Sequence, residues 1–312
     1  MDLHHLRAFV AIVDTGGFAR AAARLHLSQP ALSRQIHALE QDLGVALFDR
    51  TRRRAQLTSE GEDLIARSRA LLADAHTLGE RARALTGGDV GVLRIGAATQ
   101  AIETLLATFC ARYARRHPGV DIHLIEDGGA NLPARLERGD MHLALIAVSD
   151  ARFVHRLLLP LHVLAIAALE HRLARRAVVE IAELADLPLL LPRRGFGSRE
   201  WFDAACAVGQ MRPRVLMESA APQTLVALAR AGYGIAIVPS NTPVPRGGVR
   251  AIPLLLRGVP VGRWVTVAWD ARRVLPRYAE RFVSEFVAHT RRTYPGRDLT
   301  RRAPALPRPT LP

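Results

Sequence analysis

Lysine is absent from this 312-residue chain, so the 43 residues counted as lysine or arginine are all arginines. The absence excludes a phosphate-binding loop of the Walker type and any Schiff-base chemistry, because both need a lysine amine. The planar guanidinium of arginine instead suits bidentate hydrogen bonds with phosphate groups or with guanine. The formal charge of +14 makes an anionic partner plausible but does not locate it on the chain.

Cysteine is nearly absent as well. Cys110 and Cys206 lie far apart in the sequence, so neither a disulfide framework nor a zinc cluster is indicated. Both thiols are expected to be buried and to have no functional role. The histidines form no H-E-x-x-H zinc-binding pattern. No glycine-rich dinucleotide-binding motif follows a predicted strand, and the G-x-S-x-G motif of hydrolases does not occur. We therefore expect that the protein is not an enzyme and holds no metal or cofactor.

Long hydrophobic runs are missing too. The longest, residues 157–169, is broken by Pro160 and His162 and is too short to span a bilayer. The first residues show no basic segment followed by an apolar core and a cleavage site. These absences predict a cytoplasmic protein without a membrane partner.

Apolar residues at helical spacing predict three short helices before residue 45. The first ends at Gly16-Gly17, the second covers 18–25, and the third begins near Pro30 and ends at Gly44. One narrow arc of the third helix holds the apolar residues Leu32, Ile36, Leu39 and Leu43. The tight turn "HLSQ" between the second and third helices makes a helix-turn-helix, whose third helix has a polar face of a size to enter a major groove.

The segment 45–58 predicts two short strands around a basic tip, "RTRRR", which is typical of a wing. The residues expected to contact DNA are Ser28, Gln29, Pro30, Ser33, Arg34, Gln35, Arg50, Arg52, Arg53 and Arg54. Arg34 can donate twice to guanine, Gln29 or Gln35 can pair with adenine, and the wing arginines can hold phosphates. The alternative interpretation is a solvated helix face.

Ser59 and Glu62 form a capping box that begins a long helix, expected over residues 59–87. Steps of four and three residues separate Leu64, Ser68, Leu71, Ala75, Leu78, Ala82 and Leu85. Such a heptad predicts pairing with another helix, although packing against its own domain is the alternative. The glycines of "TGGDVG" (86–91) then predict a hinge.

Beyond the hinge, predicted strands alternate with predicted helices, which indicates parallel sheets with covering helices in two α/β lobes. The predicted strands include 120–126, 161–169 and 214–219. The first lobe is expected at about 91–160 and 266–292, and the second at about 161–265. Residues 293–312 are rich in arginine and proline, so we expect a disordered tail.

Residues 6–61 resemble the winged helix-turn-helix of the LysR-type transcriptional regulators. The pair Ala21-Ala22 and the motifs "LSQPALSRQI", "LE", "LG", "LF", "R" and "LT.EG" stand in that family's order and spacing. The resemblance implies a DNA-binding domain over 1–58, a dimerising linker helix, and an effector-binding region over 88–292 made of two Rossmann-like lobes. It also implies a homodimer that assembles to a homotetramer on promoter DNA, with RNA polymerase as a further partner.

Ligands of open α/β sheets bind beyond the carboxyl ends of the strands, where helix N-termini supply N–H donors. On that ground the residues expected to bind a small effector, such as a carboxylate, are Thr99, Gln100, Gly129, Asn131, Arg194, Phe196 and Ser198. The alternative for Thr99 and Ser198 is a plain N-cap.

The sequence thus predicts a DNA-binding transcriptional regulator controlled by a small molecule. The rival interpretation is a solute-binding protein without a regulatory role. It accounts for residues 92–290 equally well but leaves residues 1–90 unexplained.

Overall fold

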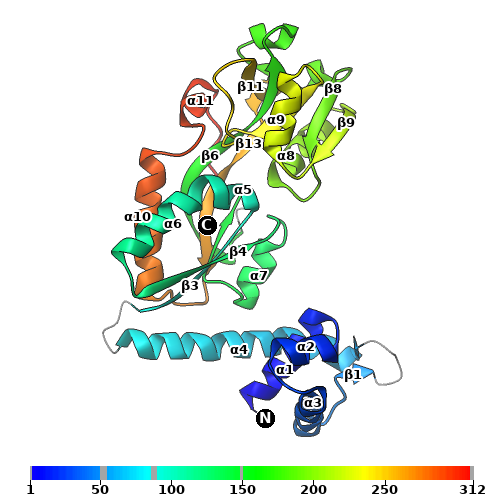
Figure 1. Ribbon diagram of the computed structural model, residues 1–312, viewed down its shortest axis with the longest axis vertical. Helices are drawn as coiled ribbons and strands as arrows, with labels where there is room; N and C mark the ends of the chain where they lie inside the picture. The colour runs from blue at the N-terminus through cyan, green and yellow to red at the C-terminus, as the bar shows by residue number, and fades with distance from the viewer. Residues whose placement is uncertain (1, 50–54, 86–89, 148–149, 310–312) are drawn as a thin grey trace. The chain divides into compact units, whose positions relative to one another are not determined.

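The computed structural model describes residues 2–49, 55–85, 90–147 and 150–309 (Figure 1). The chain forms two compact units, residues 1–87 with 137–140, and residues 88–136 with 141–312. None of the helices within the described ranges is both long enough and apolar enough to cross a membrane.

The N-terminal unit begins with the three predicted helices, which are confirmed as α1 (Leu3–Thr15), α2 (Phe18–Arg24) and α3 (Gln29–Leu43). Gly16 and Gly44 adopt left-handed backbone conformations, with φ of 70° and 71°, and so end α1 and α3. The apolar stripes of the three helices converge on one core, which includes Phe9, Ile12, Leu32, Ile36 and Leu39.

The wing strands β1 (Phe48–Asp49) and β2 (Gln56–Leu57) pair antiparallel. The buried carboxylate of Glu40 accepts hydrogen bonds from the backbone N–H groups of Leu47 (2.8 Å) and Phe48 (3.4 Å), which fastens β1 to α3. A side chain at Gly61 would collide with the backbone carbonyl of Leu47, so this position requires glycine.

The linker helix α4 (Ser59–Leu85) is the longest helix in the described part of the chain, with 27 residues. Its first half packs on the helix-turn-helix core through Leu64, Ile65 and Leu72. In contrast, Leu71 is 47% exposed and Leu78 is 72% exposed. The helix therefore leaves part of its apolar stripe uncovered within one chain.

Parallel strands form the centre of each lobe in the C-terminal unit. The strands of the first lobe are β3 (Gly91–Ala97), β4 (Val120–Glu126) and β5 (Leu143–Ile146), and those of the second are β8 (Pro188–Pro192), β9 (Arg214–Ser219) and β10 (Ile235–Pro239). The sheet order is β4-β3-β5-β13-β6-β10-β8-β9.

Two long strands join the lobes (Figure 1). These are β6 (Phe153–Ala168) and β13 (Gly262–Asp270), which pair antiparallel with each other, while β6 also pairs with β10 and β13 with β5. Along β6 the core contacts change from the first lobe at Leu161 to the second lobe at Val163. We refer to the stretch where these two strands pass between the lobes as the hinge. It differs from the hinge predicted at residues 86–91, of which 86–89 lie outside the described residues.

Helices cover both faces of the sheets. In the first lobe they are α5 (Thr99–Ala101), a π-helical turn (Ile102–Leu106), α6 (Ala107–Arg116), α7 (Leu132–Arg138) and α10 (Arg277–Arg292). In the second they are α8 (Gly197–Val208), α9 (Pro222–Arg230) and 3-10 turns at Arg172–Arg175 and Ile181–Leu184. The short strands β7 (Val179–Glu180) and β12 (Val259–Pro260) pair with β11 (Val249–Leu256), which itself pairs with β6.

The C-terminal tail differs from the disorder expected for residues 293–312. Residues 297–302 form α11 (Arg297–Arg302), and the extended segment after it lies over the hinge, where the carbonyl of Pro304 is 2.9 Å from Nε2 of His162. Leu299 packs against an apolar cluster of the second lobe and Leu306 is buried. The expectation was wrong up to residue 309, because composition counts arginine and proline but cannot show that two leucines find apolar partners.

Candidate DNA-binding surface and effector site

The turn before α3 sets its N-terminus. The Ser28 hydroxyl accepts a hydrogen bond from the backbone N–H of Ala31 at 3.3 Å, and Pro30 stands in the first turn. Ser28 therefore acts as the N-cap, which fixes the direction in which α3 starts.

The outward face of α3 carries the residues predicted to contact DNA. Gln29, Pro30, Ser33 and Arg34 are exposed together with Ser28, and Gln35 is half-buried. The Arg34 side chain forms no hydrogen bond or ion pair with any residue that the structure describes, so its guanidinium donors are open to an incoming partner. One turn further, His37 and Gln41 contact each other through their side-chain nitrogens at 3.2 Å.

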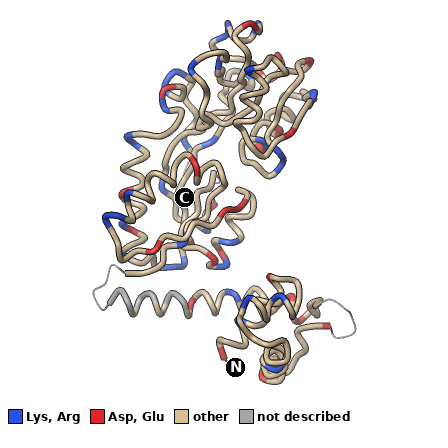
Figure 2. The backbone as a smooth tube through the Cα atoms, in the orientation of Figure 1, with Lys and Arg blue, Asp and Glu red and all other residues tan. Residues whose placement is uncertain are grey.

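Charge alone does not mark this face. Figure 2 shows acidic and basic residues interspersed along the chain, with both signs present in each unit. The predicted wing residues Arg50, Arg52, Arg53 and Arg54 lie outside the described residues.

Two predicted effector residues follow β3. The hydroxyl of Thr99 donates to the carboxylate of Glu126, at the end of the neighbouring strand β4. Gln100 is buried and its amide nitrogen donates to the hydroxyl of Thr242, 2.7 Å away, which belongs to the second lobe. Gln100 thus links the two lobes.

Asn131 closes the loop after β4. Its amide and the backbone N–H of Gly128 both donate to one oxygen of Asp127, at 2.9 and 2.7 Å, while Arg135 donates to the other oxygen. The hydrogen bond from Arg135, helped by that from Asn131, lowers the pKa of Asp127. Gly129 faces open space, so nothing in the protein demands glycine there.

The loop before α8 faces this first loop. A side chain at Gly128 would lie 3.5 Å from the backbone carbonyl of Gly195. Beside Gly195, Arg194 is exposed and Phe196 is half-buried, while Ser198 is buried. The plain N-cap interpretation of Thr99 and Ser198 was wrong, because the caps are Ala98 and Phe196.

Arg199 was missed from the sequence. It is only 3% exposed, and its guanidinium donates to Asp203 (2.8 Å), to Glu218 (2.6 Å) and to the carbonyl of Pro192 (2.8 Å). It ties α8 to the ends of β8 and β9 and so fixes the loop that carries Arg194 and Phe196. The one available signal was the four-residue spacing between Arg199 and Asp203.

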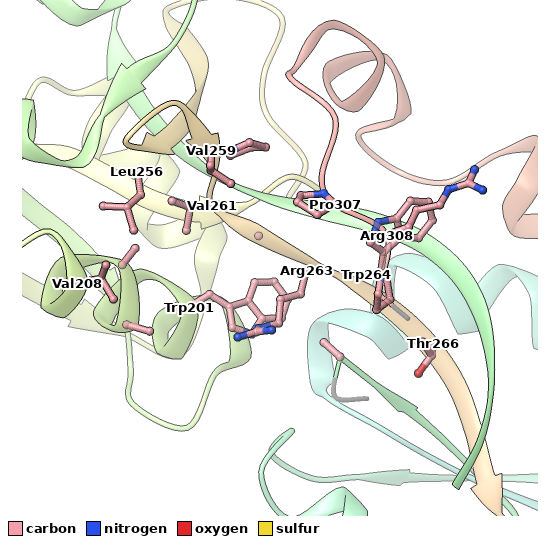
Figure 3. Close-up of a pocket in the computed structure, with 16 residues that line it drawn as sticks. Trp201, Val208, Leu256, Val259, Val261, Arg263, Trp264, Thr266, Pro307 and Arg308 are labelled. Atoms are coloured by element: carbon pink, nitrogen blue, oxygen red, sulfur yellow. The ribbon is translucent and has the colours of Figure 1, made fainter. Parts of the chain in front are cut away.

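A cavity of about 470 Å³ lies beside the hinge, between α8, β13 and the C-terminal tail (Figure 3). The predicted effector residues all lie in the described part of the chain, yet none of them lines this cavity. They are distributed instead over the two facing loops and the Gln100 link.

Comparisons with known proteins cover nearly the whole chain. The family described as "Bacterial regulatory helix-turn-helix protein, lysR family" matches residues 3–62, and the "LysR substrate binding domain" matches residues 86–291. The chain is similar to the HTH-type transcriptional regulator IlvR of Caulobacter vibrioides, with 32% identity over 262 residues that cover 82% of this chain and 88% of that protein.

Solved structures share the fold. A full-length OxyR variant from Pseudomonas aeruginosa has a TM-score of 0.68 at 25% identity, and the match covers 94% of this chain and 95% of that one. Full-length CbnR in complex with its target DNA has a TM-score of 0.61 at 24% identity, covering 93% of this chain and 100% of that one.

Proposed function

The chain belongs to the LysR family of DNA-binding transcriptional regulators, and from this premise we propose which of its residues read DNA and which hold the effector. It is a regulator with a helix-turn-helix unit and an effector-binding domain. The rival interpretation as a solute-binding protein is not favoured, because it leaves the family match over residues 3–62 unexplained.

The exposed face of α3 enters the major groove in this proposal. Arg34 contacts guanine and Gln29 or Gln35 contacts adenine, while Ser28, Pro30 and Ser33 approach the DNA backbone. The observation that carries the proposal is the polar face itself. The Arg34 side chain is exposed and forms no hydrogen bond or ion pair with the described residues, and the opposite face of its helix is packed in the core. We propose that Arg50, Arg52, Arg53 and Arg54 of the wing bind phosphates.

The effector binds between the two facing loops of the lobes in this proposal. Arg194 and the backbone N–H groups at the start of α8 suit a carboxylate, and Phe196 suits an apolar or aromatic body. Thr99, Gln100, Gly129, Asn131 and Ser198 complete the site. The approach of Gly128 to the Gly195 carbonyl supports the proposal, because it puts the two loops within reach of one small molecule.

Two chains pair along α4, and two such dimers form a tetramer on DNA. The exposure of Leu71 and Leu78 supports the pairing, since a second copy of the helix would cover them. We place the protein in the cytoplasm, where promoter DNA and RNA polymerase are available to it. The relatives named as regulators support a role without catalysis.

A gel-shift experiment with the DNA upstream of the protein's own gene tests the DNA-binding proposal. Specific retardation that competitor DNA of scrambled sequence does not abolish is expected, and it should weaken steeply with salt because phosphates are neutralised. Absence of specific retardation, with tight binding of a small solute, would favour the rival interpretation.

Thermal unfolding with a panel of benzoate, salicylate, succinate and 2-oxoglutarate tests the effector proposal. At least one acid should raise the melting temperature of the protein, and Arg194→Gln should reduce that rise. Arg212→Gln, an exposed arginine beyond the far end of α8, is the matched control. No rise with any acid would count against a carboxylate effector.

A further inference from the structure

The C-terminal tail begins on the first lobe. Tyr294 still packs against the core of that lobe, to which α10 belongs. Two residues later, Gly296 has a φ of 80°, and a side chain there would collide with the carbonyl of Ser240. Ser240 follows β10 of the second lobe, so the tail crosses from one lobe to the other between Tyr294 and Gly296. The close approach and the positive φ both require glycine at this crossing.

The short helix α11 anchors the tail to the second lobe. Its Leu299 packs against an apolar cluster that includes Leu164 of β6 and Val238 of β10. The backbone N–H of Thr300 donates to the carbonyl of Gly296 at 2.9 Å, so the helix starts directly from the crossing point. The tail is therefore attached to the second lobe as soon as it has left the first.

The extended segment after α11 lies along one face of the hinge. Gly262 of β13 pairs with His162 of β6, and Trp264 stands two residues further along β13. Directly paired residues point to the same face of a sheet, as do residues two apart on one strand. The side chains of His162 and Trp264 therefore share the face that the tail covers.

Polar and aromatic contacts fasten the segment to this face. Nε2 of His162 lies 2.9 Å from the carbonyl oxygen of Pro304, and the indole N–H of Trp264 donates to the carbonyl of Leu306 at 3.5 Å. The guanidinium of Arg308 lies over the Trp264 ring, 5.6 Å from its centroid (Figure 3). The side chain of Leu306 is buried, so the segment is packed as well as hydrogen-bonded.

We propose that residues 293–309 form a strap that holds the two lobes in the arrangement described above. The strap touches the core of the first lobe, the apolar cluster of the second lobe and the hinge between them. A rotation of one lobe against the other therefore has to break at least one of these contacts. The similarity to the LysR substrate binding domain ends at residue 291, and the strap lies outside it.

Docking of the strap also favours the approach of the two facing loops. In the arrangement that the strap holds, a side chain at Gly128 would lie 3.5 Å from the carbonyl of Gly195. Chains with a docked strap keep these loops close, whereas chains with a released strap populate arrangements in which the loops lie further apart. The consequence for the effector rests on the proposed function: an effector that bridges the loops favours the docked strap, by reciprocity.

The test measures the distance between the lobes by double electron–electron resonance. Ala134→Cys on α7 and Glu200→Cys on α8 place one nitroxide label at an exposed position in the helix that follows each facing loop. Cys110 and Cys206 are buried, so the labels attach to the introduced cysteines. Dilution with unlabelled chain restricts the measurement to distances within one chain. We expect one narrow distance distribution when the strap is intact.

Gly296→Ala is the decisive variant, because it blocks the crossing without removing any side chain that anchors the strap. We expect longer distances between the two labels in this variant. A chain that ends at Arg292 should show the same longer distances. An excess of a synthetic peptide of residues 293–309 should restore the narrow distribution to that truncated chain, which a damaged fold would not allow.

Gly247→Ala is the matched control, since a side chain there would meet no atom of the described residues within 4 Å beyond its chain neighbours. Arg301→Gln, at an exposed position of α11, leaves the anchoring contacts of the strap in place. Both should keep the narrow distribution. The proposal is overturned if Gly296→Ala or the truncated chain keeps the wild-type distances, or if the peptide does not restore them. The labels report on the lobes without any effector or DNA, so failure here leaves the proposed function standing.

Discussion

Cys110 and Cys206 illustrate how burial decides the chemistry of single side chains in this protein. Both lie in apolar clusters, and removal from water raises the pKa of each thiol to about 12. Since thiols react with disulfide reagents as thiolates, we predict that Ellman's reagent modifies neither cysteine in the native protein at neutral pH. Both should react once guanidinium chloride unfolds the chain. Rapid modification of the native protein would contradict this account of the two thiols.

His162 gives a pH dependence with a definite sign. Burial lowers its pKa below the usual value of about 6.5, although the hydrogen bond to the Pro304 carbonyl acts in the opposite direction. The unfolded chain therefore binds a proton more readily than the folded one. Neutral His162 therefore contributes to the free energy of unfolding in full above about pH 6.5, and this contribution is lost as the pH falls below that value.

We predict that the melting temperature falls between neutral pH and about pH 5, and that His162→Gln makes this fall smaller. His123→Gln, at an exposed position on β4, is the control and should leave the fall unchanged. Equal falls in the wild type and in His162→Gln would show that His162 does not titrate as described.

Individual residues differ in how far the sequence predicts them. The outward orientation of Arg34 follows from helical periodicity, because its apolar neighbours face the core. Glu40 and Arg199 could not be identified in the same way. Each is a charged residue that is buried only because distant backbone or side-chain groups satisfy it, the N–H of Leu47 for one and Glu218 for the other.

At the scale of the elements, the proposed pairing of two chains depends on α4. Leu71 and Leu78 are exposed leucines of its heptad, so replacing both by lysine puts charges where a second helix would pack. We predict that Leu71→Lys with Leu78→Lys yields monomers by sedimentation velocity. The double variant should also bind DNA more weakly, since a monomer presents only one α3 helix to the DNA.

Ala66→Lys is the control for that pair. Ala66 is exposed on α4, and the helical repeat places it away from the heptad stripe. It should leave both the assembly and the DNA affinity as they are in the wild type. Dimers that persist in the double variant would contradict the role assigned to α4.

Elements with a strong local pattern were predictable, and elements that depend on distant partners were not. β4 and β9 have the bounds predicted from their apolar and β-branched residues. The first half of β6 lies before the strand predicted at 161–169, yet the strand runs through Pro160, which pairs in register with Trp264 of β13. The missed helix α11 likewise follows Gly296, which packs closely against the carbonyl of Ser240 far away in sequence.

At the scale of the whole molecule, the sequence predicted that the chain consists of a helix-turn-helix, a linker helix and α/β lobes. It did not predict that β6 and β13 run through both lobes, or that the tail crosses them. Strand order in a sheet depends on contacts between residues far apart in the chain, and no local periodicity encodes those contacts. The same limitation holds for the two loops proposed to bind the effector, since they meet only after both lobes have formed.

The whole account depends on the exposed face of α3 reading nucleobases. The most direct test measures the affinity of the full chain for a duplex selected from a randomised library and for a scrambled duplex of equal length. We predict that Arg34→Ala with Gln29→Ala lowers the preference for the selected duplex about tenfold or more, because each base contact contributes about 1–3 kcal/mol of discrimination. Arg67→Ala, an exposed arginine on α4, should leave the preference intact. An unchanged preference in the folded double variant would contradict the assignment of α3 as the reading helix.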